Sequence, residues 1–119
     1  MNSNYIKPAG VYIHIPFCKT KCTYCDFYSL INESRINDFV DNLCKEVQLR
    51  KDEIHEPIKT IYFGGGTPSR LSKQHFEIIF ETLFSNFNVE STAEITIEAN
   101  PDDLTTEYIK MLSQLPFNR

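Results

Sequence analysis

Three cysteines near the start of the chain have the spacing of a metal-binding loop. Cys18, Cys22 and Cys25 follow the pattern C-x-x-x-C-x-x-C. Iron–sulfur clusters are held by cysteine thiolates from short loops, because several sulfurs must surround one compact cube. Three ligands leave one iron of a [4Fe–4S] cluster without a protein ligand, and that iron could bind a small molecule and pass it an electron. The spacing therefore predicts such a cluster, with these cysteines as its metal ligands.

A zinc-binding structural module is the alternative interpretation of the same cysteines. Zinc takes four ligands, so the loop would need one more, such as His14, His55 or Cys44. Zinc sites more often combine C-x-x-C with a second, distant pair, and the sequence contains no such pair. Helical spacing places Cys44 at the edge of an apolar helix face, so we expect it to be a small packing residue. We favour the cluster and keep zinc as the alternative.

Two further segments carry candidate ligand-binding groups. Residues 64–68 read GGGTP, so the backbone can approach a ligand closely, and its exposed N–H groups could take an amine or a carboxylate. Glu98 could accept hydrogen bonds from ribose hydroxyls or pair with an ammonium group. The alternatives are a plain turn for the glycines and a merely outward-facing strand residue for Glu98. Tyr12 and His14 alternate onto one face of the strand that precedes the cysteines, close enough to support a cluster.

The sequence places these groups on alternating strands and helices. Apolar and β-branched runs predict three strands, at residues 11–15, 60–63 and 94–99. Helical spacing predicts three helices: residues 34–54, ended by Pro57, a second introduced by Leu71 and Ser72, and a third introduced by Leu104 and Thr105. This α/β order favours parallel strands, in a doubly wound sheet or a β/α barrel. In both, the loops that follow the strands meet at one edge.

Composition narrows the class of protein. The chain has 119 residues, is 41% hydrophobic and 24% charged, and carries a net charge of −4. These values fit one globular domain and argue against nucleic acid as a partner, because phosphate binding needs clustered lysine and arginine. No apolar run could cross a bilayer, and the first residues lack the apolar core of an export signal. We therefore expect a cytoplasmic protein, in a compartment where closely spaced cysteines are more often ligands than disulfides.

The motifs, taken in order, resemble one branch of the radical S-adenosylmethionine (SAM) enzymes. The matching stretches are YIHIPFCKTKCTYCDF, IYFGGGTPS and ITIEANPDDLT. This branch contains the oxygen-independent coproporphyrinogen III oxidases and the HemW-type haem chaperones. The resemblance implies a partial (β/α)6 barrel, of which residues 1–119 would be the N-terminal part. A further strand would follow, and the rest of the barrel and a C-terminal domain would lie beyond Arg119.

The resemblance also implies the cofactors and their ligands. Cys18, Cys22 and Cys25 would bind the [4Fe–4S] cluster, and the amino and carboxylate groups of SAM would bind its unique iron. The positions that match contacts to this SAM are Tyr12, Gly65 and Glu98. The positions that match contacts to a second SAM in the oxidase are Tyr24, Gly66 and Thr67. The reduced cluster would cleave SAM to methionine and a 5′-deoxyadenosyl radical, while the protein supplies orientation and excludes water. No side chain is assigned as catalytic.

Two features favour the haem chaperones over the oxidase. The oxidase has one more cysteine, two places after the third, where this chain has Phe27. The oxidase also has a longer leader before its first strand. The resemblance therefore implies a protein that carries haem as cargo and passes it to an acceptor protein. A coproporphyrinogen III oxidase, with a porphyrinogen as substrate, is the alternative. The sequence identifies neither the haem acceptor nor the electron donor.

Overall fold

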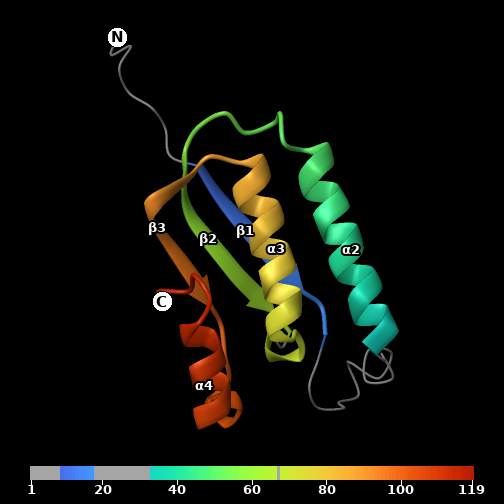
Figure 1. Cartoon of the computed structure of the whole chain (residues 1–119), viewed down its shortest axis with the longest axis vertical. Coiled ribbons are helices and arrows are strands. Elements are labelled where there is room, and N and C mark those ends of the chain that lie inside the picture. The colour runs from blue at the N-terminus through green and yellow to red at the C-terminus, as the bar shows by residue number, and fades with distance from the viewer. Residues whose placement is uncertain (1–8, 18–32, 67) are drawn as a thin grey trace.

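The computed structural model describes residues 9–17, 33–66 and 68–119. The elements are β1 (Ala9–Ile15), α2 (Glu33–Leu49), β2 (Ile58–Gly65), η1 (Pro68–Arg70), α3 (Lys73–Asn86), β3 (Val89–Ile97), η2 (Pro101–Asp103) and α4 (Thr106–Ser113) (Figure 1). The predicted alternation of strands and helices is confirmed. In this part of the chain, no helix is long and apolar enough to cross a membrane.

The three strands form one parallel sheet in the order β1-β2-β3. Tyr12 of β1 lies opposite Tyr62 of β2, which in turn lies opposite Thr96 of β3. Because the strands are parallel, the segments that follow them all begin at the same edge of the sheet. The predicted convergence is confirmed for the glycine loop and the turn after β3, and the chain leaves β1 toward the cysteine loop at this edge.

The helices cover one face of the sheet (Figure 1). Every second strand residue is buried in the core beneath α2 and α3: Ile13, Ile15, Ile61, Phe63 and Ile95. The alternate residues Tyr12 and Tyr62 stay exposed on the other face. A doubly wound sheet carries helices on both faces, whereas a barrel wall carries them on one. The sheet therefore has the arrangement of a barrel wall. The order of elements alone was compatible with both a doubly wound sheet and a barrel.

Aromatic rings link the sheet to its cover. Phe63 of β2 lies 5.7 Å from Phe76 and 5.4 Å from Phe80, both on α3, between ring centroids. Phe117, which follows α4, comes within 5.3 Å of Phe63. Offset and edge-to-face rings at these distances add to the stability gained from burial. The segment after α4 thus packs on the same side of the sheet as α3.

The first helix ends earlier than predicted. Helix α2 stops at Leu49 rather than near Ile54. Residues 50–53 are Arg-Lys-Asp-Glu, and all four are exposed, so beyond Val47 the helix has no apolar side chain to bury one turn later. The chain leaves the helix through a hydrogen-bonded turn, and Ile54 packs against the core from outside the helix.

The third strand is also displaced from its prediction. It spans Val89–Ile97, not residues 94–99, so Glu98 and Ala99 lie just beyond it. Residues 89–93 read VEST followed by alanine and show no regular alternation, yet they pair with the start of β2 through a register shift. At the other end, Pro101 has no N–H for the sheet and begins the short helix η2. The start of β3 is therefore determined by its pairing with β2 rather than by the alternation of its own residues.

Both predicted helix starts are confirmed. Ser72 caps α3, with its Oγ accepting from the N–H of His75 at 3.2 Å, while the Ser72 N–H donates to His75 Nδ1 at 3.0 Å. This is a capping box in which histidine takes the place of the usual glutamate or glutamine. Thr105 caps α4 by accepting from the N–H of Tyr108 at 3.1 Å.

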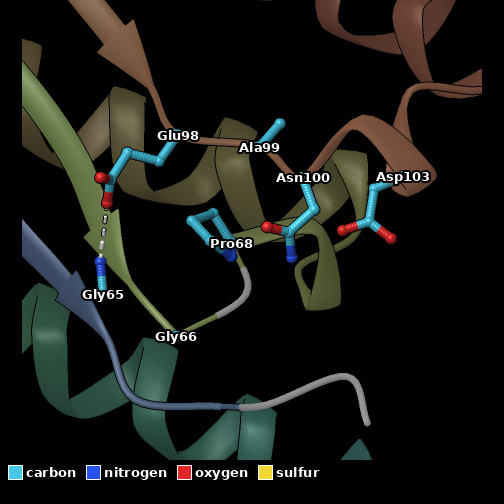
Figure 2. Close-up of a pocket in the computed structure, with 7 residues that line it drawn as sticks. All are labelled: Gly65, Gly66, Pro68, Glu98, Ala99, Asn100 and Asp103. Carbon is cyan, nitrogen blue, oxygen red and sulfur yellow. Dashed lines mark hydrogen bonds between the residues drawn. The ribbon is translucent and has the colours of Figure 1, made fainter.

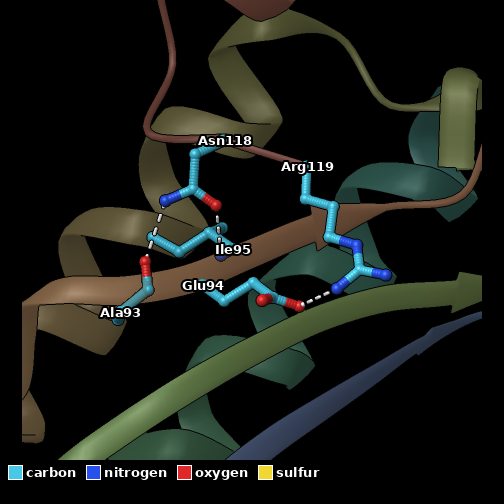
Figure 3. Close-up of polar contacts among 5 residues, drawn as sticks. All are labelled: Ala93, Glu94, Ile95, Asn118 and Arg119. Carbon is cyan, nitrogen blue, oxygen red and sulfur yellow. Dashed lines mark hydrogen bonds and ion pairs between the residues drawn. The ribbon is translucent and has the colours of Figure 1, made fainter.

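The end of the chain returns to the free edge of β3. The Arg119 N–H donates to Ile95 O, and the Ile97 N–H donates to Arg119 O, both at 3.1 Å, which is the hydrogen-bond pattern of a parallel neighbour. The Asn118 amide bridges Ala93 O and the Ile95 N–H, each at 2.8 Å (Figure 3). Residue 119 thus occupies the place that a fourth strand would take, and that strand itself stays a prediction.

Candidate functional site

The exit from β1 brings the chain to the glycine loop. Phe17, the residue before Cys18, is only 5% exposed and meets Phe39 of α2 edge-on at 5.2 Å. The N–H of Gly66 donates to Ile15 O at 2.7 Å. The cysteine loop therefore starts from a packed position beside the end of β2. Five predicted site residues lie outside the described residues, and their roles stay predictions: Cys18, Cys22, Tyr24, Cys25 and Thr67.

Three side chains converge above Gly64. A Cβ placed on this glycine would lie 2.5 Å from Glu98 Oε1, 2.9 Å from Tyr62 Cε1 and 3.0 Å from Tyr12 Oη. Real Cβ atoms essentially never come so close to other atoms, so only glycine leaves room for this arrangement. The next residue, Gly65, has a φ of +104°, which also favours glycine. The glycines thus allow the chain's own polar groups to gather, and the plain-turn alternative does not account for this crowding.

The N–H groups of Gly65 and Gly66 form hydrogen bonds within the protein, contrary to our expectation. We expected exposed N–H groups here to take an amine or a carboxylate from a ligand. The Gly65 N–H instead donates to Glu98 Oε1 at 3.1 Å (Figure 2), and the Gly66 N–H is bonded to Ile15 O. The loop is therefore fixed to its neighbours on both sides. The group that remains available as an acceptor is the exposed Glu98 carboxylate, whose chemistry suits an ammonium or hydroxyl group.

Glu98 lies at the centre of the site. Its backbone N–H donates to Phe63 O at 3.0 Å and continues the sheet by one residue, while its side chain is exposed. A hydrogen bond with this carboxylate is the largest cause that raises the pKa of Tyr62 above 10.0. Tyr62 was not predicted as a site residue, although its alternation with Ile61 and Phe63 places it on the exposed face.

Tyr12 and His14 come together as predicted. Tyr12 Oη lies 3.2 Å from His14 Nδ1, and the Tyr12 ring stacks on Tyr62 with centroids 5.8 Å apart and planes 21° apart. Tyr12 is 59% exposed, so it remains open to a ligand on the uncovered face of the sheet. The structure thus brings three predicted residues, Tyr12, Gly65 and Glu98, into one polar group and adds Tyr62 to them.

A pocket of about 270 Å³ opens between the glycine loop and the turn after β3 (Figure 2). It is lined by Gly65, Gly66, Pro68, Glu98, Ala99, Asn100 and Asp103. Its volume lies just below the range of about 300 to 1,000 Å³ that is usual for ligand pockets, so it suits part of a ligand rather than a whole cofactor. Neither Asn100 nor Asp103 was predicted as a site residue, although their turn follows a strand end, where functional sites are common. The carboxylates and the amide make the lining rich in acceptors, which fits a ligand group that carries donors.

Cys44 and the three histidines do not form a metal site by themselves. Across residues 9–17, 33–66 and 68–119, no three His, Cys, Asp or Glu side chains lie close enough to share a metal ion. Cys44 is half-buried and packs against the core, as its helical spacing predicted. His75 is buried in its capping box and approaches Asn37 Oδ1 at 2.6 Å.

The family model and the most similar relatives all relate this chain to radical SAM proteins. The model of the radical SAM superfamily matches residues 12–119. The heme chaperone HemW of Lactococcus lactis is 42% identical over 114 residues, which are 95% of this chain and 29% of that protein. The oxygen-independent coproporphyrinogen III oxidase of Synechocystis is 34% identical over 121 residues, which are 98% of this chain and 26% of that protein.

A solved structure of a protein from the same family has a similar fold. The coproporphyrinogen III oxidase HemN from Escherichia coli, described as a radical SAM enzyme, superposes with a TM-score of 0.81 and is 28% identical. The match covers 98% of this chain and 28% of that one, so the chain spans less than a third of the length of these relatives. The three parallel strands correspond to part of the partial barrel of that enzyme. The chain belongs to the radical SAM superfamily, in its HemW/HemN-like branch, and this membership implies a [4Fe–4S] cluster and SAM as cofactors.

Proposed function

We propose that this chain binds a [4Fe–4S] cluster through Cys18, Cys22 and Cys25 and holds SAM at the carboxyl edge of the sheet. The supporting observation is the convergence of Tyr12 and Glu98 above Gly64, beside the point where β1 leads into the cysteine loop. We also propose that residues 1–119 are the N-terminal part of a radical SAM core domain. When both cofactors are bound, they supply the radical chemistry, and the protein orients them.

In this proposal each residue has a limited task. Glu98 accepts hydrogen bonds from donor groups of the SAM that binds the unique iron, and Tyr12 lines the same space from β1. Gly65 lets the backbone turn and directs its N–H to Glu98. Tyr24, Gly66 and Thr67 match positions in the family motifs that contact a second SAM, and we assign them that role. The buried Phe17 beside Cys18 helps keep water from the cluster, which influences its reduction potential.

Metal analysis after anaerobic purification tests the cluster. We expect iron and acid-labile sulfide in equal amounts in the wild-type protein and neither in a Cys22→Ser variant. A Cys44→Ala variant is the matched control, because Cys44 packs against the core and is not proposed as a ligand. Stoichiometric zinc without sulfide would support the zinc module and contradict the cluster. Loss of iron from both variants would show that Cys44 was wrongly excluded.

We further propose that the full-length protein is a cytoplasmic haem chaperone of the HemW type, which binds haem and passes it to an acceptor protein. In support, the HemW relative is 42% identical and the oxidase relative 34% identical, and Phe27 stands where the oxidase has its additional cysteine. Haem would bind mainly through residues beyond Arg119. The alternative is an oxygen-independent coproporphyrinogen III oxidase.

Two assays on the full-length protein separate these functions. Haem titration followed by absorbance should show saturable binding, and an anaerobic assay with coproporphyrinogen III, SAM and a reductant should show no protoporphyrinogen. Rapid conversion of coproporphyrinogen would overturn the chaperone proposal and support the oxidase. Such conversion would not contradict the proposed cluster and SAM site, because the chaperone and the oxidase both require them.

A further inference from the structure

Tyr62 lies beside both polar side chains of the proposed SAM site, Tyr12 and Glu98. It lies between Tyr12 and Thr96 in the sheet, on the face that the helices leave uncovered. Its ring stacks on Tyr12, and its edge comes near the same point above Gly64 as Glu98 Oε1 and Tyr12 Oη. Tyr62 is therefore the central member of a group that spans all three strands.

Its contacts restrict how the Glu98 carboxylate can turn. Oε1 accepts from the Gly65 N–H at 3.1 Å, and an edge carbon of the Tyr62 ring lies near the same point above Gly64 as this oxygen. A carboxylate has about four lone-pair positions, so the backbone donor and the neighbouring phenol restrict its plane and leave other positions for a ligand. The nearby carboxylate also raises the pKa of Tyr62 above 10.0, which agrees with a phenol placed beside Glu98.

We propose that Tyr62 is a positioning residue for SAM, which orients Glu98 through its hydroxyl and supports Tyr12 through its ring. This inference rests on the SAM site proposed above. A binding group that is already oriented before the ligand arrives loses less conformational freedom on binding, so the affinity is higher. Tyr62 acts through Glu98 and is not itself required to touch the ligand.

A Tyr62→Phe variant tests this role because it keeps the ring and removes only the hydroxyl. SAM is titrated into the reduced, cluster-containing protein, and binding is followed by the change in the electron paramagnetic resonance spectrum of the cluster. The midpoint reports only molecules that are folded and hold a cluster, so a loss of stability alone does not shift it. Tyr108→Phe is the matched control, since the buried Tyr108 hydroxyl has no hydrogen-bond partner among the described residues.

We expect Tyr62→Phe to raise the Kd for SAM by about tenfold, as for loss of one hydrogen bond to a charged group, and Tyr108→Phe to leave it unchanged. The double variant Tyr62→Phe, Glu98→Gln should bind no more weakly than Glu98→Gln alone, because the hydroxyl acts through Glu98.

Two results would overturn the inference. One is wild-type affinity in Tyr62→Phe, and the other is a double variant whose loss equals the sum of the two single losses. If the wild-type protein holds its cluster but does not bind SAM, the proposed function itself fails, and this inference fails with it. That case is distinct because it appears before any variant is made.

Discussion

Gly64 shows how one position without a side chain sets up the site. Above its Cα lie groups from all three strands, namely Glu98 just after β3, Tyr62 of β2 and Tyr12 of β1. A methyl group would meet the ends of these side chains, which can move aside. Gly66 differs, because a methyl group there would collide with the backbone oxygen of Phe17, which cannot move independently. The two glycines are thus required for different reasons.

This contrast gives a prediction at the scale of single residues. Gly64→Ala should weaken SAM binding strongly while lowering the free energy of unfolding only slightly. Gly66→Ala should destabilise the protein by about 1 to 3 kcal/mol, in the range found for overpacked sites. Urea denaturation measures the stability of both variants, and the SAM titration described above measures affinity. Equal stability losses in the two variants would contradict the distinction.

At the scale of elements, helix α3 is fixed at its start by His75. Its Nδ1 accepts from the Ser72 N–H, which leaves Nε2 to carry the proton and donate to Asn37 Oδ1 at 2.6 Å. One buried ring thus closes the capping box of α3 and links that helix to α2. The packing of α2 against α3 depends on this polar link as well as on apolar contacts.

We expect His75→Ala to lower the free energy of unfolding by about 1 to 2 kcal/mol, since it removes a cap and a buried ring that is hydrogen-bonded to Ser72 and Asn37. Gln74→Ala is the matched control, because its neighbouring side chain is exposed on the same helix. Thermal and urea denaturation of both variants check the prediction. Alanine is the best helix former, so a similar loss in the control would contradict the role of the cap.

Tyr108 of helix α4 makes the free energy of unfolding depend on pH. Burial, aided by the charge of Asp103, raises the pKa of Tyr108 from 10.0 to about 12. The folded chain keeps this proton where the unfolded chain has lost it, so stability falls as the pH rises from 10 toward 12. Tyr108→Phe should lose less stability over the same interval, as measured by urea denaturation at several pH values. Parallel curves for the two proteins would rule this contribution out.

At the scale of the whole molecule, Phe63 connects the sheet to the layers above it. It is fully buried and contacts Phe76, Phe80 and Phe117, so β2, α3 and the segment after α4 meet at one ring. The same strand carries Tyr62 and Gly64 on its other face. The packing of Phe63 on the covered face therefore fixes the position of β2, and with it the positions of Tyr62 and Gly64 on the uncovered face.

Phe63→Ala should destabilise the protein by about 3 to 5 kcal/mol, as expected for removing a buried aromatic ring. Phe84→Ala offers a comparison with the same change on an exposed face of α3, since Phe84 is 43% exposed, and should cost about 1 kcal/mol. Urea denaturation gives both values. Equal losses would mean that the cluster around Phe63 is not the centre of the core.

The sequence by itself determined the order of the elements, the two helix caps at Ser72 and Thr105, and the edge where the loops meet. Each of these follows from patterns within one element or from the rule that parallel strands end together. The motifs around the cysteines and glycines also indicated the family correctly. Helical spacing predicted the packing role of Cys44, although the charged residues 50–53 ended its helix earlier than expected.

Tertiary structure alone decided which groups meet across the sheet. Alternation shows that Tyr12, Tyr62 and Glu98 face the same way, but sliding one strand by two residues preserves that pattern and changes every neighbour. The pairing of Tyr12 with Tyr62, and the hydrogen bond from Gly65 to Glu98, depend on the actual register. The covering of one face, which distinguishes a barrel wall from a doubly wound sheet, likewise depends on where the helices pack, because the order of elements is the same in both.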